Sequence, residues 1–266
     1  MPRLAILGGG FMGGALAEGL IDSGWSPEDL VIAEIRAARR AFLEDHLKLP
    51  TTDDALEAAS KAASVLFAVK PQDVQSCLDT VAAAFSPGKL AISICAGVRT
   101  AQFERALGDV PVIRAMPNTP AAIGQGATAI ARGRFAKDDH LATALNILST
   151  VGRVVVVEES QMDAVTAVSG TGPAYVFYLA EALISAAQKE GLSKEQAYVL
   201  VYQTFVGASE LLSHDPAGPA ELRARVTSPG GTTQAALEFL EKNDWFRIFE
   251  QAVHRARERS EELGGG

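Results

Sequence analysis

The stretch LAILGGGFMGGAL at residues 4–16 decides how this chain folds. A short apolar run leads directly into Gly8, Gly10 and Gly13, which have the G-x-G-x-x-G spacing, and an amphipathic segment begins at Phe11. Glycines at such a turn let the backbone approach a pyrophosphate, and the free N–H groups and dipole of the following helix favour anions. We therefore expect a strand, a tight turn and a helix that bind a dinucleotide.

Similar apolar runs recur along the first part of the chain, separated by amphipathic stretches. Each run is too short for a buried helix and lacks the alternation of a half-exposed strand, which indicates parallel strands covered on both faces. The runs are Leu4 to Leu7, Leu30 to Ile35, Ser64 to Val69, Leu90 to Cys95 and Val110 to Arg114, with Arg153 to Val157 as a last strand. This alternation predicts an α/β fold with a doubly wound parallel sheet.

The remainder of the chain has the pattern of helices alone. Helical windows cover 161–168, 173–189 and 194–212, and Ser193 is an expected N-cap. Alanine accounts for 45 of the 266 residues and aromatic residues for 6%, so these helices have small side chains for close packing against a partner chain. We expect a nucleotide-binding domain at 1–159 and an all-helical substrate-binding and dimerisation domain at 160–266.

Composition and charge exclude several classes of function. A net charge of -8 argues against a nucleic-acid partner, which needs a basic surface. The N-terminus does not resemble a signal peptide and no run of 18 apolar residues is present, so we expect a cytoplasmic protein without a membrane segment. The two cysteines, Cys77 and Cys95, are expected to be buried thiols, and the four scattered histidines indicate no metal site.

The choice between NADH and NADPH stays open from the residues. Glu34 ends the second predicted strand, 26 residues after Gly8, where a carboxylate binds a ribose hydroxyl and would repel a 2′-phosphate. Arg36, Arg39 and Arg40 follow, and they fit either a phosphate site or a solvated helix face.

Three loops that follow predicted strands are candidates for the nicotinamide side of the site. They are AVKP at 68–71, ICAG at 94–97 and RAMPNTP at 114–120. Asn118 fits either a carboxamide partner or an ordinary Asx turn, and Lys70 fits either a phosphate partner or a surface cation.

Two glycine-bearing stretches interrupt the helical half, SGTGPAY at 169–175 and SPGGTT at 228–233. Free N–H groups at a helix start, with hydroxyls beside them, suit a small carboxylate, although both stretches also fit helix caps with close glycine crossings. The SPGGTT constellation contains no acid or base, and the sequence offers no conspicuous general acid. We therefore expect a substrate that needs little proton transfer from the protein, such as an imine.

Taken together, the motifs resemble those of pyrroline-5-carboxylate reductases. The resemblance covers nearly the whole chain and rests on GGGFMGGAL at 8–16, AVKP, RAMPNTP, DAVTAVSGTGPAY at 163–175 and VTSPGGTT at 226–233. It implies NADH- or NADPH-dependent reduction of 1-pyrroline-5-carboxylate to L-proline, the last step of proline biosynthesis. It also implies an N-terminal Rossmann domain and a helical domain that forms homodimers, often built into a decamer.

The resemblance also assigns roles to residues of this chain. Thr232 and Thr233 would hold the substrate carboxylate through backbone N–H groups, the Thr233 hydroxyl would reach the ring nitrogen as the catalytic group, and Glu159 would lie near the substrate. The expected substrate-binding residues are Glu159, Ser228, Gly230, Gly231, Thr232 and Thr233. The expected cofactor-binding residues are Gly8, Gly9, Gly10, Phe11, Met12, Glu34, Arg36, Ala68, Val69, Lys70, Pro71, Ile94, Cys95, Ala96 and Asn118.

The chain departs from the family pattern at Glu34, at Asp54 and at Arg223–Ala224–Arg225 just before the SPGGTT segment. The first two departures weaken an NADPH assignment. Three other functions remain as alternatives. One is a related two-domain reductase of a β-hydroxy acid, with Lys189, Lys194 or Lys242 as general acid, and the others are a reductase of another cyclic imine and a non-catalytic dinucleotide sensor.

Overall fold

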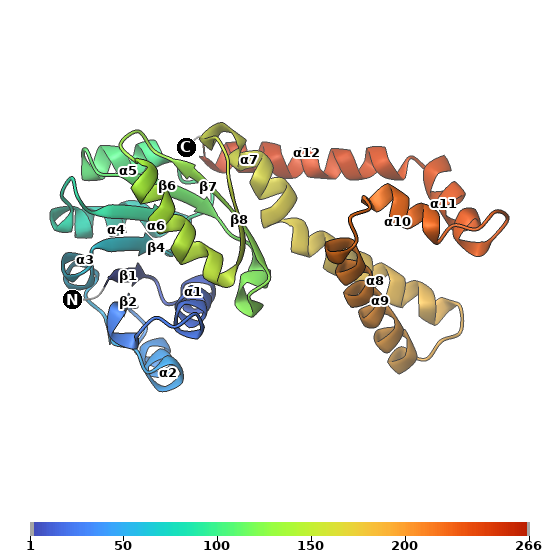
Figure 1. The fold of residues 1–266 in the computed structure, drawn as a ribbon, viewed down its shortest axis with the longest axis horizontal. Helices are drawn as coiled ribbons and strands as arrows, with labels where there is room; N and C mark the ends of the chain where they lie inside the picture. Colours follow the sequence, from blue (N-terminus) through green and yellow to red (C-terminus); the bar gives the residue numbers. More distant parts are fainter. Residues whose placement is uncertain (1–2, 265–266) are drawn as a thin grey trace. The chain divides into compact units, whose positions relative to one another are not determined.

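The computed structural model describes residues 3–264 and divides them into two compact units. The first, the sheet unit, contains the residues up to Gly172 together with those from Ala256 onward. The second, the helical unit, is Pro173–Arg255. Figure 1 shows the helices and strands of both units.

An eight-stranded sheet forms the centre of the sheet unit, in the order β3-β2-β1-β4-β5-β6-β7-β8. The strands are β1 Leu4–Leu7, β2 Leu30–Ala33, β3 Thr51–Thr52, β4 Ser64–Phe67, β5 Leu90–Ser93, β6 Val112–Met116, β7 Gly126–Arg132 and β8 Gly152–Val156. The neighbours from β3 to β6 are parallel, which confirms the predicted doubly wound sheet.

The far edge of the sheet differs from the prediction. β7 pairs antiparallel with β6, with Met116 opposite Ala129, and β8 then runs parallel to β7. β7 escapes sequence reasoning because its GATAIAR composition is dominated by small residues of low strand preference. β3 has only two residues, too few for a hydrophobic pattern.

Helices cover both faces of the sheet because successive strand residues point to opposite faces. Ile6 belongs to one buried cluster with Leu16 and Ile147, and Leu7 belongs to the other with Leu78 and Phe103. The helices of this unit are α1 Phe11–Asp22, α2 Ala37–Leu47, α3 Ala55–Lys61, α4 Val74–Val81, α5 Thr100–Leu107, α6 Asp138–Leu148 and α7 Met162–Val165. The strands thus hold their carboxyl ends rigidly at one edge, where loops can form a site.

The compact units divide later than residue 159. Met162 at the start of α7 is fully buried with Ala129 and Ala131 of β7. Ser260, near the end of the last helix, donates a 2.7 Å hydrogen bond to Asp163. By packing, residues 160–172 and the chain end therefore belong with the sheet, whereas the division into domains 1–159 and 160–266 stays a prediction about function.

After β8, the described part of the chain contains helices and no strand, as predicted. The remaining helices are α8 Gly172–Lys189, α9 Lys194–His214, α10 Pro219–Arg225, α11 Thr232–Lys242 and α12 Trp245–Gly264. Ser193 is the N-cap of α9, as predicted, because its hydroxyl accepts a 3.2 Å hydrogen bond from the Gln196 N–H.

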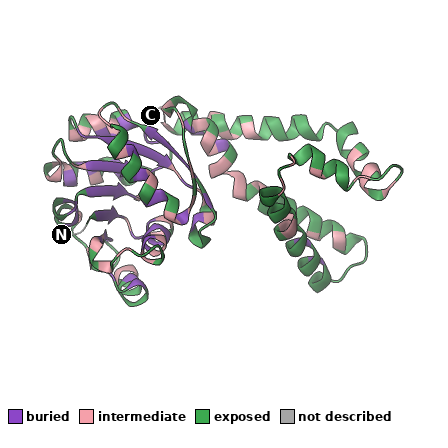
Figure 2. Ribbon diagram, viewed as in Figure 1, coloured by how far each residue is buried: buried purple, intermediate pink, exposed green. Residues whose placement is uncertain are grey.

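The helical unit buries few of its own apolar side chains. Within α8 to α11 only Ala197 and Val201 are buried (Figure 2). Large side chains such as Phe177 (62% exposed) and Tyr202 (54% exposed) lie open to solvent in the single chain. Apolar surface on this scale marks an interaction site.

Candidate dinucleotide cleft and substrate loop

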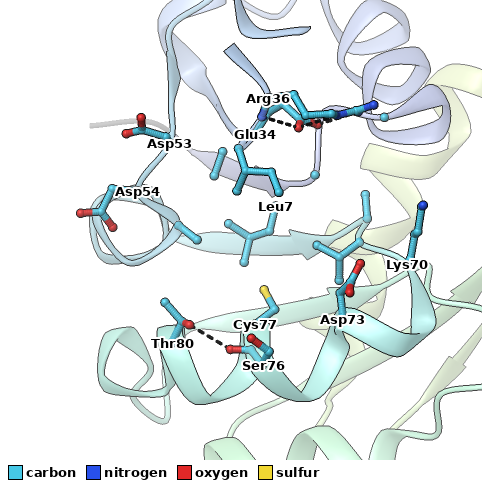
Figure 3. Close-up of a pocket in the computed structure, with 17 residues that line it drawn as sticks. Leu7, Glu34, Arg36, Asp53, Asp54, Lys70, Asp73, Ser76, Cys77 and Thr80 are labelled. Carbon is cyan, nitrogen blue, oxygen red and sulfur yellow. Dashed lines mark hydrogen bonds and ion pairs between the residues drawn. The ribbon is translucent and has the colours of Figure 1, made fainter. Parts of the chain in front are cut away.

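A cleft of about 760 Å³ lies at the carboxyl ends of β1, β2 and β4 (Figure 3). This is where open α/β sheets bind ligands, beside the point at which the strand order reverses. Seven of the predicted cofactor residues line it: Gly8, Gly10, Glu34, Arg36, Ala68, Val69 and Lys70.

The glycine turn between β1 and α1 holds the backbone against the neighbouring strand end. Gly8 has φ +108°, and a Cβ at this residue would lie 2.6 Å from the carbonyl oxygen of Ala68. Its N–H donates a 2.8 Å hydrogen bond to the carbonyl of Ala33. Only glycine fits both the backbone conformation and the space.

The helix start that follows is free to bind an anion. Gly10 is the N-cap of α1, and this helix has neither a side-chain cap nor an acidic residue in its first turn. The first N–H groups of a helix lack intrahelical acceptors, so those of α1 are available to a pyrophosphate beside Gly8 and Gly10. The fit to a dinucleotide thus rests on the uncapped start of α1 and on the open space beside Gly10, where a Cβ would meet nothing within 4 Å.

Glu34 lies at the end of β2, with its carboxylate in the cleft wall and only 6% of its side chain exposed. Arg36 donates to both oxygens, from Nε at 2.9 Å and from Nη2 at 3.0 Å, and its backbone N–H donates at 2.9 Å as well (Figure 3). These bonds from Arg36 hold the pKa of Glu34 below its usual value, so the carboxylate is ionised at neutral pH.

The other two arginines contact backbone carbonyls. Arg39 donates from Nε to the Gly9 carbonyl at 2.6 Å and from Nη2 to that of Gly10 at 3.2 Å. Arg40 donates from Nη1 to the Glu34 carbonyl at 2.7 Å and pairs with Asp53 at 3.2 Å. Both therefore hold loops in place and are not part of the solvated helix face that the sequence left as an alternative.

The rest of the cleft wall contains residues that sequence reasoning did not assign to the site, apart from Asp54, which it noted as a departure from the family pattern. Asp53 and Asp54 follow the short strand β3, and α4 contributes Ser76, Cys77 and Thr80 (Figure 3). Asp73, Ser76, Cys77 and Thr80 lie at positions i, i+3, i+4 and i+7, which places them on one face of a helix. This spacing was the signal in the sequence that could have indicated a shared wall. Burial raises the pKa of the Cys77 thiol to about 11, which makes it a neutral thiol in this wall.

The other predicted cofactor residues do not line this cleft. They are Gly9, Phe11, Met12, Pro71, Ile94, Cys95, Ala96 and Asn118. The buried Cys95 thiol points into the sheet unit and donates to the carbonyls of Phe67 and Val69, both at 3.4 Å. Asn118 accepts a 2.9 Å bond from the Ala127 N–H and donates to the Ser169 carbonyl at 3.2 Å, so its amide ties β6 to the segment after α7.

Glu159 has partners within the sheet unit. One carboxylate oxygen accepts from the Thr100 N–H at 2.8 Å and lies 3.5 Å from Arg114, and the other accepts from the Thr100 hydroxyl at 2.7 Å. Glu159 therefore caps the first turn of α5 and neutralises the buried Arg114. Its predicted place beside the substrate stays a prediction.

In the helical unit, residues 228–233 form a tight turn into α11. The Gly231 N–H donates to the Ser228 carbonyl at 3.0 Å, the Gly230 N–H donates to Gln234 Oε1 at 2.7 Å, and Gly230 has φ +71°. The cap residue of α11 is Gly231, with no side-chain cap and no acidic residue in the first turn. The N–H groups of Thr232 and Thr233 are among those that the helix start leaves without an intrahelical acceptor.

Arg223 and Arg225, which depart from the family pattern, take part in ion pairs away from this turn. Arg225 contacts Asp215 at 2.6 Å and Glu221 at 2.7 Å, and Arg223 lies 3.7 Å from Glu241. They fix α10 to its neighbours.

Within residues 3–264 there is neither a candidate metal cluster nor a candidate membrane-spanning helix. No group of three or more histidine, cysteine, aspartate or glutamate side chains is placed to hold a metal ion. No helix in this range is long and apolar enough to span a bilayer.

A doubly wound sheet with a glycine turn and an acidic residue at the carboxyl edge defines a dinucleotide-binding protein of the Rossmann type. A family model for pyrroline-5-carboxylate reductase dimerisation matches residues 159–263, and one for NADP oxidoreductase, coenzyme F420-dependent, matches residues 3–97. A pyrroline-5-carboxylate reductase of Synechocystis sp. is 42% identical to this chain, and the alignment covers 98% of this chain and 98% of that protein.

Solved structures give the same result. A pyrroline-5-carboxylate reductase from Coxiella burnetii has a TM-score of 0.94 at 34% identity, with 98% of each chain covered. The pyrroline carboxylate reductase of Plasmodium falciparum with NADP bound has a TM-score of 0.88 at 31% identity, covering 99% of this chain and 98% of that one. This chain belongs to the pyrroline-5-carboxylate reductase family, and it is an NAD(P)-dependent oxidoreductase that acts on a C=N bond.

Proposed function

We propose that this protein reduces 1-pyrroline-5-carboxylate to L-proline with NADH or NADPH, the last step of proline biosynthesis. The observation that carries the proposal is that this chain, a member of the family, has two helix N-termini suited to binding an anion, at α1 and at α11, each without a side-chain cap. The first suits the pyrophosphate of a dinucleotide and the second suits the carboxylate of a small substrate.

The dinucleotide, when bound, supplies the hydride. Reduction adds this hydride to the imine carbon and one proton to the ring nitrogen, which converts the C=N bond into the C–N bond of a cyclic amine. On the protein, Gly8, Gly10 and the first turn of α1 would hold the pyrophosphate, and Glu34 the adenosine ribose. Binding and orientation are thus the main contributions of the chain.

The turn at 228–233 would position the substrate. The N–H groups of Thr232 and Thr233 donate to the carboxylate, and the Thr233 hydroxyl lies one residue into the helix, where it can bond the ring nitrogen. The Gly230 and Gly231 N–H groups hold the turn itself, so these glycines act through shape. Ser228 adds a further hydroxyl to the turn, and Glu159 remains a proposed substrate neighbour.

The exposed apolar helices fit assembly through the helical unit, which matches the dimerisation model. We propose a homodimer in which residues of α8 and α9 such as Phe177 and Tyr202 become buried, assembled further into a decamer. Both helices bury too little within one chain to be stable alone. The protein is proposed to be cytoplasmic, with no membrane or nucleic-acid partner.

The activity is tested with purified protein, pyrroline-5-carboxylate and each reduced dinucleotide, by following dinucleotide oxidation and L-proline formation. Thr233→Ala is expected to lower kcat/KM by about 1–3 kcal/mol because a hydrogen bond to the reacting ring is lost. Thr143→Ala, at an exposed hydroxyl of α6 that bonds its own helix, is the matched control and should change nothing. Absence of turnover with both dinucleotides refutes the proposal.

A further inference from the structure

The adenosine end of the cleft is defined by the end of β2, because this is where a Rossmann-type sheet binds the ribose hydroxyls. The charged side chains that line the whole cleft are the carboxylates of Glu34, Asp53, Asp54 and Asp73 and the cations of Arg36 and Lys70. Glu34, Asp53 and Asp54 follow β2 and β3, whereas Lys70 follows β4, on the other side of β1. The adenosine end is therefore acidic.

A 2′-phosphate at this end would need a cation, and the nearby arginines already have partners. Arg36 places Nε and Nη2 on the two oxygens of Glu34 at 2.9 and 3.0 Å. Arg39 is bonded to the glycine turn, and Arg40 to the Glu34 carbonyl and Asp53. A phosphate that used the remaining N–H groups of Arg36 would meet a guanidinium whose charge Glu34 already neutralises, and it would lie beside that ionised carboxylate. A phosphate that displaced Glu34 from Nε and Nη2 would leave the carboxylate ionised and unpaired next to it.

We infer that Glu34, with Arg36 fixed against it, makes this chain select the dinucleotide that lacks the 2′-phosphate, NADH, over NADPH. The inference rests on the dinucleotide cleft of the proposed function and adds a preference that the family membership leaves open. One ribose hydroxyl of NADH can donate to Glu34 without displacing Arg36, since Arg36 makes three bonds to the carboxylate, which has about four acceptor sites.

The test measures binding in the absence of substrate. Dissociation constants for NADH and NADPH, and for ADP-ribose and its 2′-phosphate, are obtained by titration calorimetry with the full chain. Wild type is expected to bind NADH about tenfold or more tightly than NADPH, and ADP-ribose more tightly than its 2′-phosphate by the same factor; a tenfold ratio corresponds to about 1.4 kcal/mol. Added salt should narrow the difference, because it screens the repulsion.

Three variants identify the residues responsible. Glu34→Gln should remove most of the preference, because the repelling charge is lost and Arg36 is released. Arg36→Ala, at a side chain 63% exposed, should weaken NADPH binding further, because Glu34 then lacks the cation that neutralises it. Asp109→Asn removes an exposed carboxylate that does not line the cleft, and it should alter neither constant.

Several results would overturn the inference. These are a wild-type protein that binds NADPH as tightly as NADH, a Glu34→Gln variant with an unchanged ratio, or an Arg36→Ala variant with tighter NADPH binding. If Glu34→Gln fails to fold, the wild-type ratio and the Arg36→Ala variant decide. Preferential NADH binding without turnover of pyrroline-5-carboxylate would refute the proposed function and leave this inference standing, whereas absence of dinucleotide binding would refute both.

Discussion

Gly8→Ala is expected to destabilise the sheet unit, whereas Gly10→Ala in the same turn is not. At Gly8 the backbone has φ +108° and the new Cβ would lie 2.6 Å from the Ala68 carbonyl oxygen. The Ala68 backbone is held in place by a 2.8 Å hydrogen bond from its N–H to the Leu7 carbonyl, so the Ala68 carbonyl cannot move freely away from the new Cβ. Backbone strain of about 1–3 kcal/mol and the steric clash together predict a loss of about 2–4 kcal/mol.

Gly10 is the matched control because its φ is -65° and a Cβ there would meet nothing within 4 Å. Alanine at this N-cap should cost less than about 1 kcal/mol. Since Gly10 lines the cleft, the added methyl group should instead weaken dinucleotide binding. The two substitutions therefore separate folding from binding.

The assay is denaturant unfolding followed by the fluorescence of Trp25, which packs against the core of the sheet unit. A Trp245→Phe background removes the signal from the helical unit. Titration with NADH gives the affinity of each variant. Equal stability of Gly8→Ala and wild type, or equal losses for the two variants, would refute the steric argument.

Three further changes test other parts of the structure. Glu159→Gln should lower stability by about 1–3 kcal/mol because Thr100 and the buried Arg114 lose a charged partner, and the loss should appear in thermal unfolding; an unchanged midpoint would contradict the capping role. Cys77, with its pKa raised to about 11, should react slowly with maleimide at pH 7 and faster as the pH rises, because its thiolate fraction increases; bound dinucleotide should slow the reaction by filling the cleft. A labelling rate that depends neither on pH nor on dinucleotide would refute this, and Cys77→Ser is the control. Gly230→Ala places a side chain at φ +71°, at a cost of about 1 kcal/mol, and should raise KM for the imine while the Kd for NADH stays unchanged; a parallel loss of NADH binding would contradict a local effect.

Much of the sheet unit could be predicted from local sequence. The glycine spacing and the apolar runs place Gly8, Glu34 and Lys70 at strand ends, and the structure brings them to one cleft. β7 could not be predicted, because its stability comes from the pairing of Ala129 and Ala131 with β6 rather than from the strand preference of alanine.

The partners of polar side chains were harder to predict than their positions. Asn118 follows β6 and Glu159 follows β8, as the predicted strand order places them. Their hydrogen bonds, however, join Asn118 to Ala127 and Ser169, and Glu159 to Thr100, which is 59 residues away along the chain. Nothing local in the sequence distinguishes an amide or carboxylate that faces a ligand from one that ties two loops together.

The sequence by itself determined the alternation of strands and helices, the glycine turn and the helix starts at α1 and α11, because these depend on periodicity and on backbone conformations that few residues adopt. Only the tertiary structure decided what the charged side chains do. The position of Arg39 on the glycine turn and of Arg40 on Asp53 follows from how α2 packs against α1 and β3. Arg36 is only two residues from Glu34, yet the sequence did not show whether its guanidinium would face that carboxylate or a phosphate. An arginine that follows an acidic residue in sequence can reach a phosphate, a carbonyl or a carboxylate, and the choice depends on distances that only the folded chain sets.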